Sequence, residues 1–228
     1  MVAKLRIIFI SLHQMNKILY ISILFFALAI LYFSPVQLPS KLAYPVAFLG
    51  LMALLDFRHI GISMALGLVF SALGDWQGTQ GNFLGQMGFF GLAHVAYLCY
   101  FVRRSKNVPN WKRAIGYSMT SAMMIGGFAF IVIVPEVPTG IIKIGVSIYI
   151  VLIMTMMFTA FLQRDWLFAL GAALFVISDF ILAWNKFLNP IPHASWFIMV
   201  PYYLAQWLLY YRATTVASAA CSCTSQDK

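Results

Sequence analysis

Residues 166–185 read WLFALGAALFVISDFILAWN, an apolar run of 20 residues whose single charged side chain is Asp179. A helix that crosses a bilayer needs about 20 predominantly apolar residues, so this stretch predicts one crossing. The whole chain has the same character, because 62% of its 228 residues are hydrophobic and 9% are charged. A soluble domain carries about 25% charged residues. The composition therefore predicts a polytopic membrane protein and excludes an ordinary soluble domain.

Further apolar runs on both sides of this stretch are separated by proline, glycine and charged residues. None of them alternates between apolar and polar residues as the strands of a barrel do, and helices are then the structure that can cross a membrane. The predicted fold class is all-α: a polytopic membrane helical bundle of about eight transmembrane helices. The expected crossings are 17–33, 41–55, 60–76, 83–102, 113–134, 140–162, 166–185 and 195–211.

These crossings divide the chain into three parts. Residues 1–16 form a basic N-terminal segment, residues 17–212 the eight-helix transmembrane domain and residues 213–228 a polar C-terminal tail. Residues 1–16 lack a small-residue cleavage motif, so we expect the first apolar run to be retained as a helix rather than removed as a signal.

The positions of the lysine and arginine residues predict the orientation of the bundle, because cytoplasmic loops carry an excess of them. With the N-terminus inside, 12 of the 15 basic residues fall in cytoplasmic segments, and Lys41, Lys143 and Lys186 fall outside. We therefore expect a multi-pass protein of the cell (inner) membrane with both termini cytoplasmic. The net charge of +9 comes largely from a loop at 103–113, and we expect no nucleic-acid partner.

The cysteine and histidine residues show no pattern that would hold a metal. Cys99, Cys221 and Cys223 form neither an even disulfide set nor a ligand spacing with the four histidines. A Gly-x-Ser-x-Gly elbow and a zinc-binding His pair are also missing from the sequence. We expect no metal site, no structural disulfide and no cofactor.

Two aspartates lie inside predicted crossings, at the ends of similar motifs. Residues 67–75 read GLVFSALGD and residues 171–179 read GAALFVISD, each with a glycine eight residues before the aspartate. They fall in the third helix of each half, so the chain shows signs of a 4+4 parallel repeat. In the predicted orientation both helices run outward, which places Asp75 and Asp179 at similar depth in the outer half of the membrane.

A charged residue inside a membrane helix costs about 2.5–3.5 kcal/mol on insertion scales and is usually kept for a function. A structural role stays open for both residues: Asp75 is followed at once by Trp76 and a polar loop, and either carboxyl could serve one structural hydrogen bond. If Asp75 and Asp179 share an apolar pocket, burial and mutual repulsion keep one protonated and the other ionised at neutral pH. That combination is what acid–base hydrolysis requires.

Polar residues on neighbouring crossings are candidates for the same cavity. Ser71 precedes Asp75 by four residues and shares its helix face, as Tyr202 does with Gln206. Structural readings stay open here too, since tyrosines gather at membrane interfaces and lysines snorkel to the surface, although a lysine could also pair with a lipid phosphate. The candidate binding residues are Lys41, Ser71, His94, Tyr97, Asn185, Lys186, Tyr202 and Gln206.

These motifs together resemble the YhhN-like lysoplasmalogenase family, over a region from about Lys41 to Arg212. The chain departs from the family pattern where Leu42 replaces a common proline and where Trp76 and Gln77 follow the first motif, which bears on substrate preference. The matching stretches are FSALGD at 70–75, GLAH at 91–94 with Tyr97, GAALFVISD at 171–179, NKF at 185–187 and YYLAQ at 202–206.

The resemblance implies a small membrane hydrolase that cleaves the vinyl ether bond of lysoplasmalogens. Its products would be a fatty aldehyde and glycerophosphoethanolamine or glycerophosphocholine, and its partners a lysophospholipid substrate and the membrane lipids. Asp75 and Asp179 would then be the catalytic acid and base, in either assignment. Two other functions remain open from the residues alone: a small proton-coupled transporter that uses the aspartates as a relay, and a lipid-binding membrane protein without catalysis.

Overall fold

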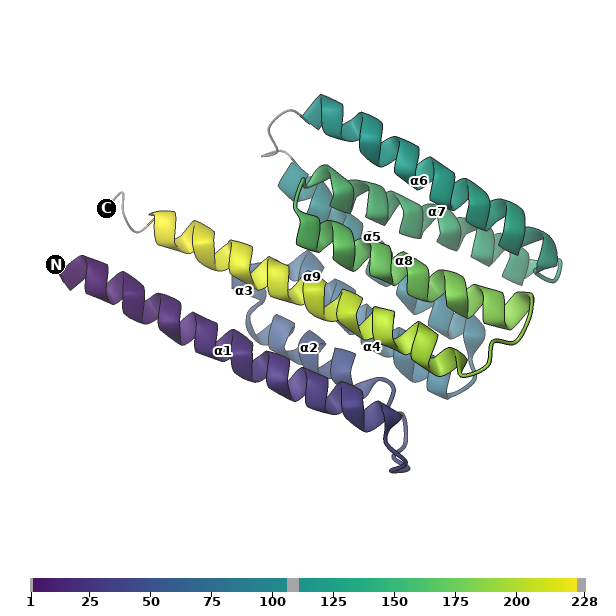
Figure 1. The fold of residues 1–228 in the computed structure, drawn as a ribbon, viewed down its shortest axis with the longest axis horizontal. Helices are drawn as coiled ribbons and strands as arrows, with labels where there is room; N and C mark the ends of the chain where they lie inside the picture. The colour runs from purple at the N-terminus through teal and green to yellow at the C-terminus, as the bar shows by residue number, and fades with distance from the viewer. Residues whose placement is uncertain (1, 106–110, 225–228) are drawn as a thin grey trace.

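The computed structural model describes residues 2–105 and 111–224, and over these residues the chain forms helices and no strand, as predicted (Figure 1). The side chains of residues 2–14, 111–114, 117 and 219–224 lie outside the description. The elements are α1 (Val2–Phe33), α2 (Tyr44–Leu55), α3 (Phe57–Ile60), α4 (Ile62–Thr79), α5 (Phe83–Ser105), α6 (Trp111–Ile133), the 3-10 helix η1 (Val134–Glu136), α7 (Ile141–Leu162), α8 (Trp166–Phe187) and α9 (Ala194–Thr224).

Each predicted crossing coincides with a helix, and the helix ends follow local chemistry. Pro45 occupies the first turn of α2, where its missing N–H costs no hydrogen bond. Gly61 and Gly140 precede α4 and α7 with φ of 93° and 106°, backbone angles that favour glycine. Asp165 caps α8 by accepting a hydrogen bond from the backbone N–H of Leu167 at 3.3 Å. The residues at the helix ends therefore define the limits of the helices as clearly as the apolar runs do.

Within residues 2–105 and 111–224, five helical segments are long and apolar enough to cross a membrane: Met15–Phe33, Phe83–Ser105, Ser118–Glu136, Ile141–Leu162 and Trp166–Phe187. The protein is thus an integral multi-pass membrane protein. The other three expected crossings remain predictions. The 12 residues of α2 extend about 18 Å at 1.5 Å per residue, which is less than the hydrocarbon thickness of about 30 Å. Glycine and polar residues in α4, and the polar end of α9, lower the apolar character of those two helices.

The helices form a bundle in which the N- and C-terminal ends of the chain lie at the same end (Figure 1). Helices α6 and α1 lie at opposite edges of the bundle in this view, and α4, α5, α8 and α9 lie between them. Helix α4 packs on α5, and α8 packs on α9. The candidate site lies where these two pairs meet.

The glycines of the two similar motifs have the same structural effect. A Cβ at Gly67 on α4 would clash with the ring of Tyr97 on α5, and a Cβ at Gly171 on α8 would lie 3.2 Å from Cδ2 of Leu209 on α9. Each glycine therefore lets the next long helix approach closely. This correspondence agrees with the predicted 4+4 repeat, which remains a prediction along with the cytoplasmic location of the termini.

Candidate active site

Asp75 lies near the C-terminal end of α4, and its side chain points toward α9. The residue is 2% exposed, and its Oδ2 accepts a hydrogen bond of 2.8 Å from the hydroxyl of Tyr202. Placing a carboxyl in such an apolar bundle is unfavourable unless it is hydrogen-bonded. Tyr202 supplies that partner to one carboxyl oxygen, and within the described residues the other oxygen accepts no hydrogen bond.

Asp179 lies on α8, and its Oδ2 accepts a hydrogen bond of 2.5 Å from the hydroxyl of Tyr149 on α7. His94 on α5 is fully buried, with its Nε2 2.9 Å from the Tyr149 hydroxyl and 3.6 Å from Oδ2 of Asp179. Because Tyr149 donates its proton to Asp179, its oxygen is free to accept a hydrogen bond from His94 Nε2. A histidine, a tyrosine and an aspartate from three helices thus form one polar chain.

Both aspartates line the same cavity, which encloses about 240 Å³. A single water needs about 10–15 Å³ of such space and two to four polar partners, so this cavity has room for water and for a small polar group. Its wall reaches the protein surface at Ser195, which is exposed in the first turn of α9. The lining also includes Tyr32, Gln86, Phe90, Ser178, Leu182, Asn185, Met199 and Tyr202.

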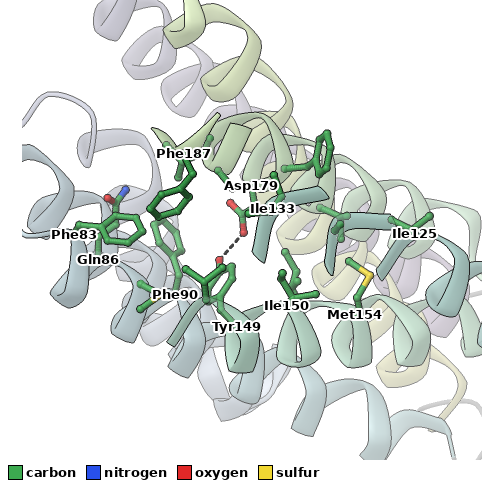
Figure 2. Close-up of a pocket in the computed structure, with 18 residues that line it drawn as sticks. Phe83, Gln86, Phe90, Ile125, Ile133, Tyr149, Ile150, Met154, Asp179 and Phe187 are labelled. Atoms are coloured by element: carbon green, nitrogen blue, oxygen red, sulfur yellow. Dashed lines mark hydrogen bonds between the residues drawn. The ribbon is translucent and has the colours of Figure 1, made fainter. Parts of the chain in front are cut away.

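A second, apolar pocket lies on the other side of Asp179, between α5, α6, α7 and α8 (Figure 2). In Figure 2 the hydrogen bond between Asp179 and Tyr149 lies between Phe83 and Gln86 at one end of this pocket and Ile125 and Met154 at the other. The two spaces have a common boundary. The residues that line both are Gln86, Phe90, Asp179 and Leu182.

Three predicted site residues lie behind Asp75 and line neither the polar cavity nor the apolar pocket: Ser71, Tyr97 and Gln206. Tyr97 is fully buried and donates a hydrogen bond of 2.7 Å to Oε1 of Gln206. Ser71 is also fully buried, on the same helix as Asp75. Tyr202 and Gln206 share a face of α9, as their spacing predicts, because both make hydrogen bonds toward α4 and α5. These residues form a polar support beneath the Asp75–Tyr202 pair.

Asn185 lines the cavity, and its Oδ1 accepts a hydrogen bond of 2.8 Å from the backbone N–H of Ile191. This bond ties the end of α8 to the loop that leads into α9. Ser178, which precedes Asp179, lines the cavity too and donates a hydrogen bond of 2.9 Å to the carbonyl of Ile198. Asn185 therefore holds the loop before α9, and Ser178 holds α9 itself, against α8 next to the carboxyls.

The two predicted phosphate-binding lysines lie outside the cavity. Lys41 Nζ donates hydrogen bonds of 2.7 Å and 3.0 Å to the carbonyls of Ser34 and Val36, just beyond the C-terminal end of α1. Lys186 Nζ lies 4.4 Å from the centre of the Phe83 ring. Because Phe83 also lines the apolar pocket, the Lys186 ammonium lies at the edge of that pocket.

Sequence reasoning missed Tyr149 and Gln86. Tyr149 is a single tyrosine within the apolar run 140–162, and a hydroxyl in the middle of such a helix is a signal for a buried hydrogen bond. Gln86 lies on the boundary between the cavity and the apolar pocket. The polar start of its helix gave no sequence signal for this residue. Among the described residues, no group of three or more His, Cys, Asp and Glu is placed to hold a metal ion.

Several known proteins are similar in sequence to this chain. The chain is 30% identical over 158 residues to bovine lysoplasmalogenase TMEM86A, covering 63% of this chain and 62% of that relative. The human TMEM86A protein is 31% identical over 163 residues, with the same shares covered. Pig lysoplasmalogenase TMEM86B is 29% identical over 212 residues, covering 87% of this chain and 88% of the relative.

The matched region thus spans about three-fifths of the length of the TMEM86A relatives. No solved structure matches this chain. The model of the YhhN family matches residues 36–213, a region that contains both aspartates, both of the tyrosines bonded to them and His94. The match covers most of the chain, and the protein belongs to the YhhN family.

Proposed function

We propose that this protein is a membrane-embedded hydrolase that cleaves the vinyl ether bond of lysoplasmalogens, with Asp75 and Asp179 as its acid–base pair. The relatives named lysoplasmalogenase support the reaction class. The observation that carries the mechanism is that the two carboxyl groups line one cavity. The products are a fatty aldehyde and glycerophosphoethanolamine or glycerophosphocholine.

The reaction needs one proton donor, one proton acceptor and one water. A protonated aspartate gives its proton to the vinyl carbon that is not bonded to oxygen, and the double-bond electrons form the new C–H bond. The positive charge that results is shared between the other carbon and the ether oxygen. The second, ionised aspartate takes a proton from a cavity water while the water oxygen bonds to that carbon, which gives a hemiacetal.

The hemiacetal then breaks its bond to the glycerol oxygen. The aspartate that was first ionised returns its proton to the glycerol oxygen, and the other carboxylate takes the hydroxyl proton as the aldehyde forms. Both carboxyls return to their starting states, and the sum is the addition of one water. The scheme assigns complementary roles to Asp75 and Asp179, and either residue can start as the acid.

The surrounding contacts suit the two carboxyls to these roles. Tyr202 donates a hydrogen bond to one oxygen of Asp75, and Tyr149 donates one to an oxygen of Asp179. Each hydrogen bond orients its carboxyl and leaves the other oxygen for substrate or water. Positioned hydrogen-bond donors of this kind also stabilise charge that develops during a reaction. Tyr97 and Gln206, through their mutual hydrogen bond, support Tyr202 from behind.

The boundary position of Asp179 also fits the shape of the substrate. A lysoplasmalogen has a single hydrocarbon chain joined at the vinyl ether to a polar glycerophospho group. The apolar pocket would take the chain, and the polar cavity with Asn185 would take the glycerol. Lys186 at the edge of the apolar pocket is then the better partner for the phosphate, because Lys41 already donates to two backbone carbonyls.

The test is to mix the purified protein, in detergent, with lysoplasmenylethanolamine and to measure released fatty aldehyde. We expect aldehyde in proportion to the amount of protein, without any ion gradient. A proton-coupled carrier would release no aldehyde, and its activity would appear only as substrate uptake into sealed vesicles that hold a proton gradient. A protein that only binds lipid would show neither signal.

A further inference from the structure

Helices α6 and α7 form a groove on the edge of the bundle, which encloses about 580 Å³. Its walls are apolar, and several of the side chains in them are exposed. Met123 is 67% exposed, Val151 60% and Phe130 44%. In a protein embedded in a bilayer, exposed apolar side chains face the lipid chains. The lining of the groove includes Met123, Gly126, Gly127, Phe130, Ile150 and Met154.

The groove adjoins the candidate active site through shared wall residues. Ile150 and Met154 of α7 line both the groove and the apolar pocket, and Asp179 lines both the apolar pocket and the polar cavity. Figure 2 shows Met154 at the end of the apolar pocket that lies away from Phe83 and Gln86, with Asp179 between. Groove, pocket and cavity therefore follow one another from the lipid-facing surface to the carboxyls.

The length of the pocket suits one lipid chain. Its α7 wall runs from Val146 to Met154, about 12 Å of helix at 1.5 Å per residue. Half of a hydrocarbon core of about 30 Å is the depth that a chain reaches in one leaflet, which is close to this length. The pocket encloses about 90 Å³, so a chain widens it on entry. The flexible side chains of Met87 and Met154 in its wall can make that room.

Two adjacent glycines line the groove, and Gly127 leaves the space above it open. A Cβ added at Gly127 would have no atom within 4 Å, so the space above this residue is free. At Gly126 an added Cβ would lie 2.7 Å from Cγ of Met154, the residue between the groove and the pocket. A side chain at Gly127 would narrow the groove without meeting any packed atom, whereas one at Gly126 would displace Met154.

We propose that the α6–α7 groove is the portal through which the single hydrocarbon chain of a lysolipid passes sideways from the bilayer into the apolar pocket. The inference rests on the proposed function for the identity of the ligand. It adds the route: the chain stays among apolar side chains while the head group reaches the polar cavity from the membrane surface. The length of the substrate's hydrocarbon chain and its embedding in the membrane then affect turnover through α6 and α7, independently of the catalytic groups.

The first test compares Gly127→Trp with Gly88→Trp, in turnover of two substrates. Gly88 lies exposed on α5, lines none of these spaces and also has no atom within 4 Å of an added Cβ. For a long-chain lysoplasmalogen in a bilayer, we expect Gly127→Trp to lower kcat/KM by about tenfold or more. A short-chain, water-soluble vinyl ether should be cleaved within about twofold of the wild-type rate. Gly88→Trp should leave both rates unchanged.

Gly127→Leu adds less volume, and we expect a smaller decrease in the same direction. It keeps the comparison informative if the tryptophan variant does not fold, because leucine is a better helix former than glycine. Equal rates for wild type and Gly127→Leu on the long-chain substrate, together with normal rates for Gly127→Trp, would overturn the portal.

The second test does not depend on catalysis. The probe is a saturated ether lysophospholipid, which cannot be cleaved at a vinyl ether, with a photoreactive diazirine at the end of its chain. We expect crosslinks on Met123, Phe130 or Met154 in wild type and in Gly88→Trp, and their loss in Gly127→Trp. Crosslinks of this probe to the groove, together with no aldehyde release from a lysoplasmalogen, would retain the portal and reject the proposed hydrolase.

Aldehyde release with no crosslink to α6 or α7 would retain the hydrolase and reject the portal. A second copy of the chain in the groove is the other occupant that the glycines would admit. In that case wild type would be a dimer in detergent, Gly127→Trp would be a monomer, and the chain probe would not label the groove. That result also overturns the proposal.

Discussion

Tyr149 on α7 donates a hydrogen bond of 2.5 Å to Oδ2 of Asp179 on α8. The same hydroxyl lies 2.9 Å from Nε2 of the buried His94, so one phenol connects a histidine to a carboxyl that lines the cavity. A single donor therefore fixes the orientation of Asp179 and leaves one of its oxygens for chemistry. Tyr202 has the same relation to Asp75.

Replacing Tyr149 by phenylalanine removes this donor and keeps the ring. A hydrogen bond to a charged group contributes about 1.5–3 kcal/mol, so we expect kcat to fall roughly 10- to 100-fold with little change in KM. The pH dependence of kcat should also move, because the carboxyl loses its partner. Steady-state kinetics over a range of pH measures both effects. The control is Tyr20→Phe, which changes a hydroxyl on a residue that is 71% exposed; a loss in both variants would speak against a local role.

Replacing Tyr202 by phenylalanine tests the other carboxyl. Asp75 is 2% exposed, and Tyr202 is its hydrogen-bond partner among the described residues. Its loss leaves a buried carboxyl unsatisfied, which costs about 1–3 kcal/mol or more. We expect both a lower thermal unfolding temperature and a lower kcat. An unfolding temperature equal to that of wild type would show that Asp75 finds another partner.

The pH profile of kcat tests the need for two protonation states. One carboxyl must be protonated and the other ionised, so the rate falls at low pH, where the base gains a proton, and at high pH, where the acid loses its proton. We therefore expect a bell-shaped profile that has both limbs in wild type. A rate that rises or falls with pH over the whole range in which the protein is folded would contradict a pair of complementary carboxyls.

The opposite end of the bundle supplies a stability prediction. Asp165 caps α8 and accepts a hydrogen bond of 2.6 Å from Nε of Arg212 on α9. Asp165→Ala removes the cap and leaves Arg212 without this partner, and we expect a loss of about 1–2 kcal/mol in the free energy of unfolding. Unfolding in detergent measures the loss. The activity of the folded fraction should stay unchanged, because Asp165 lies far from the cavity along α8.

The exposed Lys17–Asp56 pair is the matched comparison for that variant. Its Nζ–Oδ2 distance is 3.0 Å, but the Lys17 side chain is 42% exposed, and such pairs contribute about 0–1 kcal/mol. Lys17→Ala should therefore change the free energy of unfolding less than Asp165→Ala does. The reverse order would show that burial of Asp165 does not strengthen its interactions.

Much of this fold could be predicted because its signals are local. Apolar runs between proline, glycine and charged residues gave the position of each long helix, and the four-residue spacing of Tyr202 and Gln206 gave their shared face. The short helix α3 falls within Asp56–Gly61, where the apolar pattern is interrupted. The pattern does not define the number of crossings, because the 12 residues of α2 are too few to cross a bilayer alone.

The details of the site depend on which helices meet, and a single sequence does not carry that information. The spacing of His94 and Tyr97 suggests a common environment, yet His94 faces Tyr149 and Tyr97 faces Gln206. Lys41 has the charge to bind a phosphate, but its ammonium is held by carbonyls beyond the end of α1. The contact of Tyr149 with Asp179 depends on α7 packing beside α8, which the sequence of either helix alone does not indicate.

The central claim is that Asp75 and Asp179 are both required for vinyl ether hydrolysis, and the most direct measurement is aldehyde release by purified Asp75→Asn and Asp179→Asn. Asparagine keeps the size of the side chain and one acceptor oxygen, and it removes the acid–base function. Asp56→Asn, outside the cavity, is the control. General acid–base catalysis contributes about 100- to 10,000-fold, so we expect each variant of the pair to lose at least about 100-fold in kcat while the control stays at the wild-type rate. Near-normal aldehyde release by either folded variant would contradict the account.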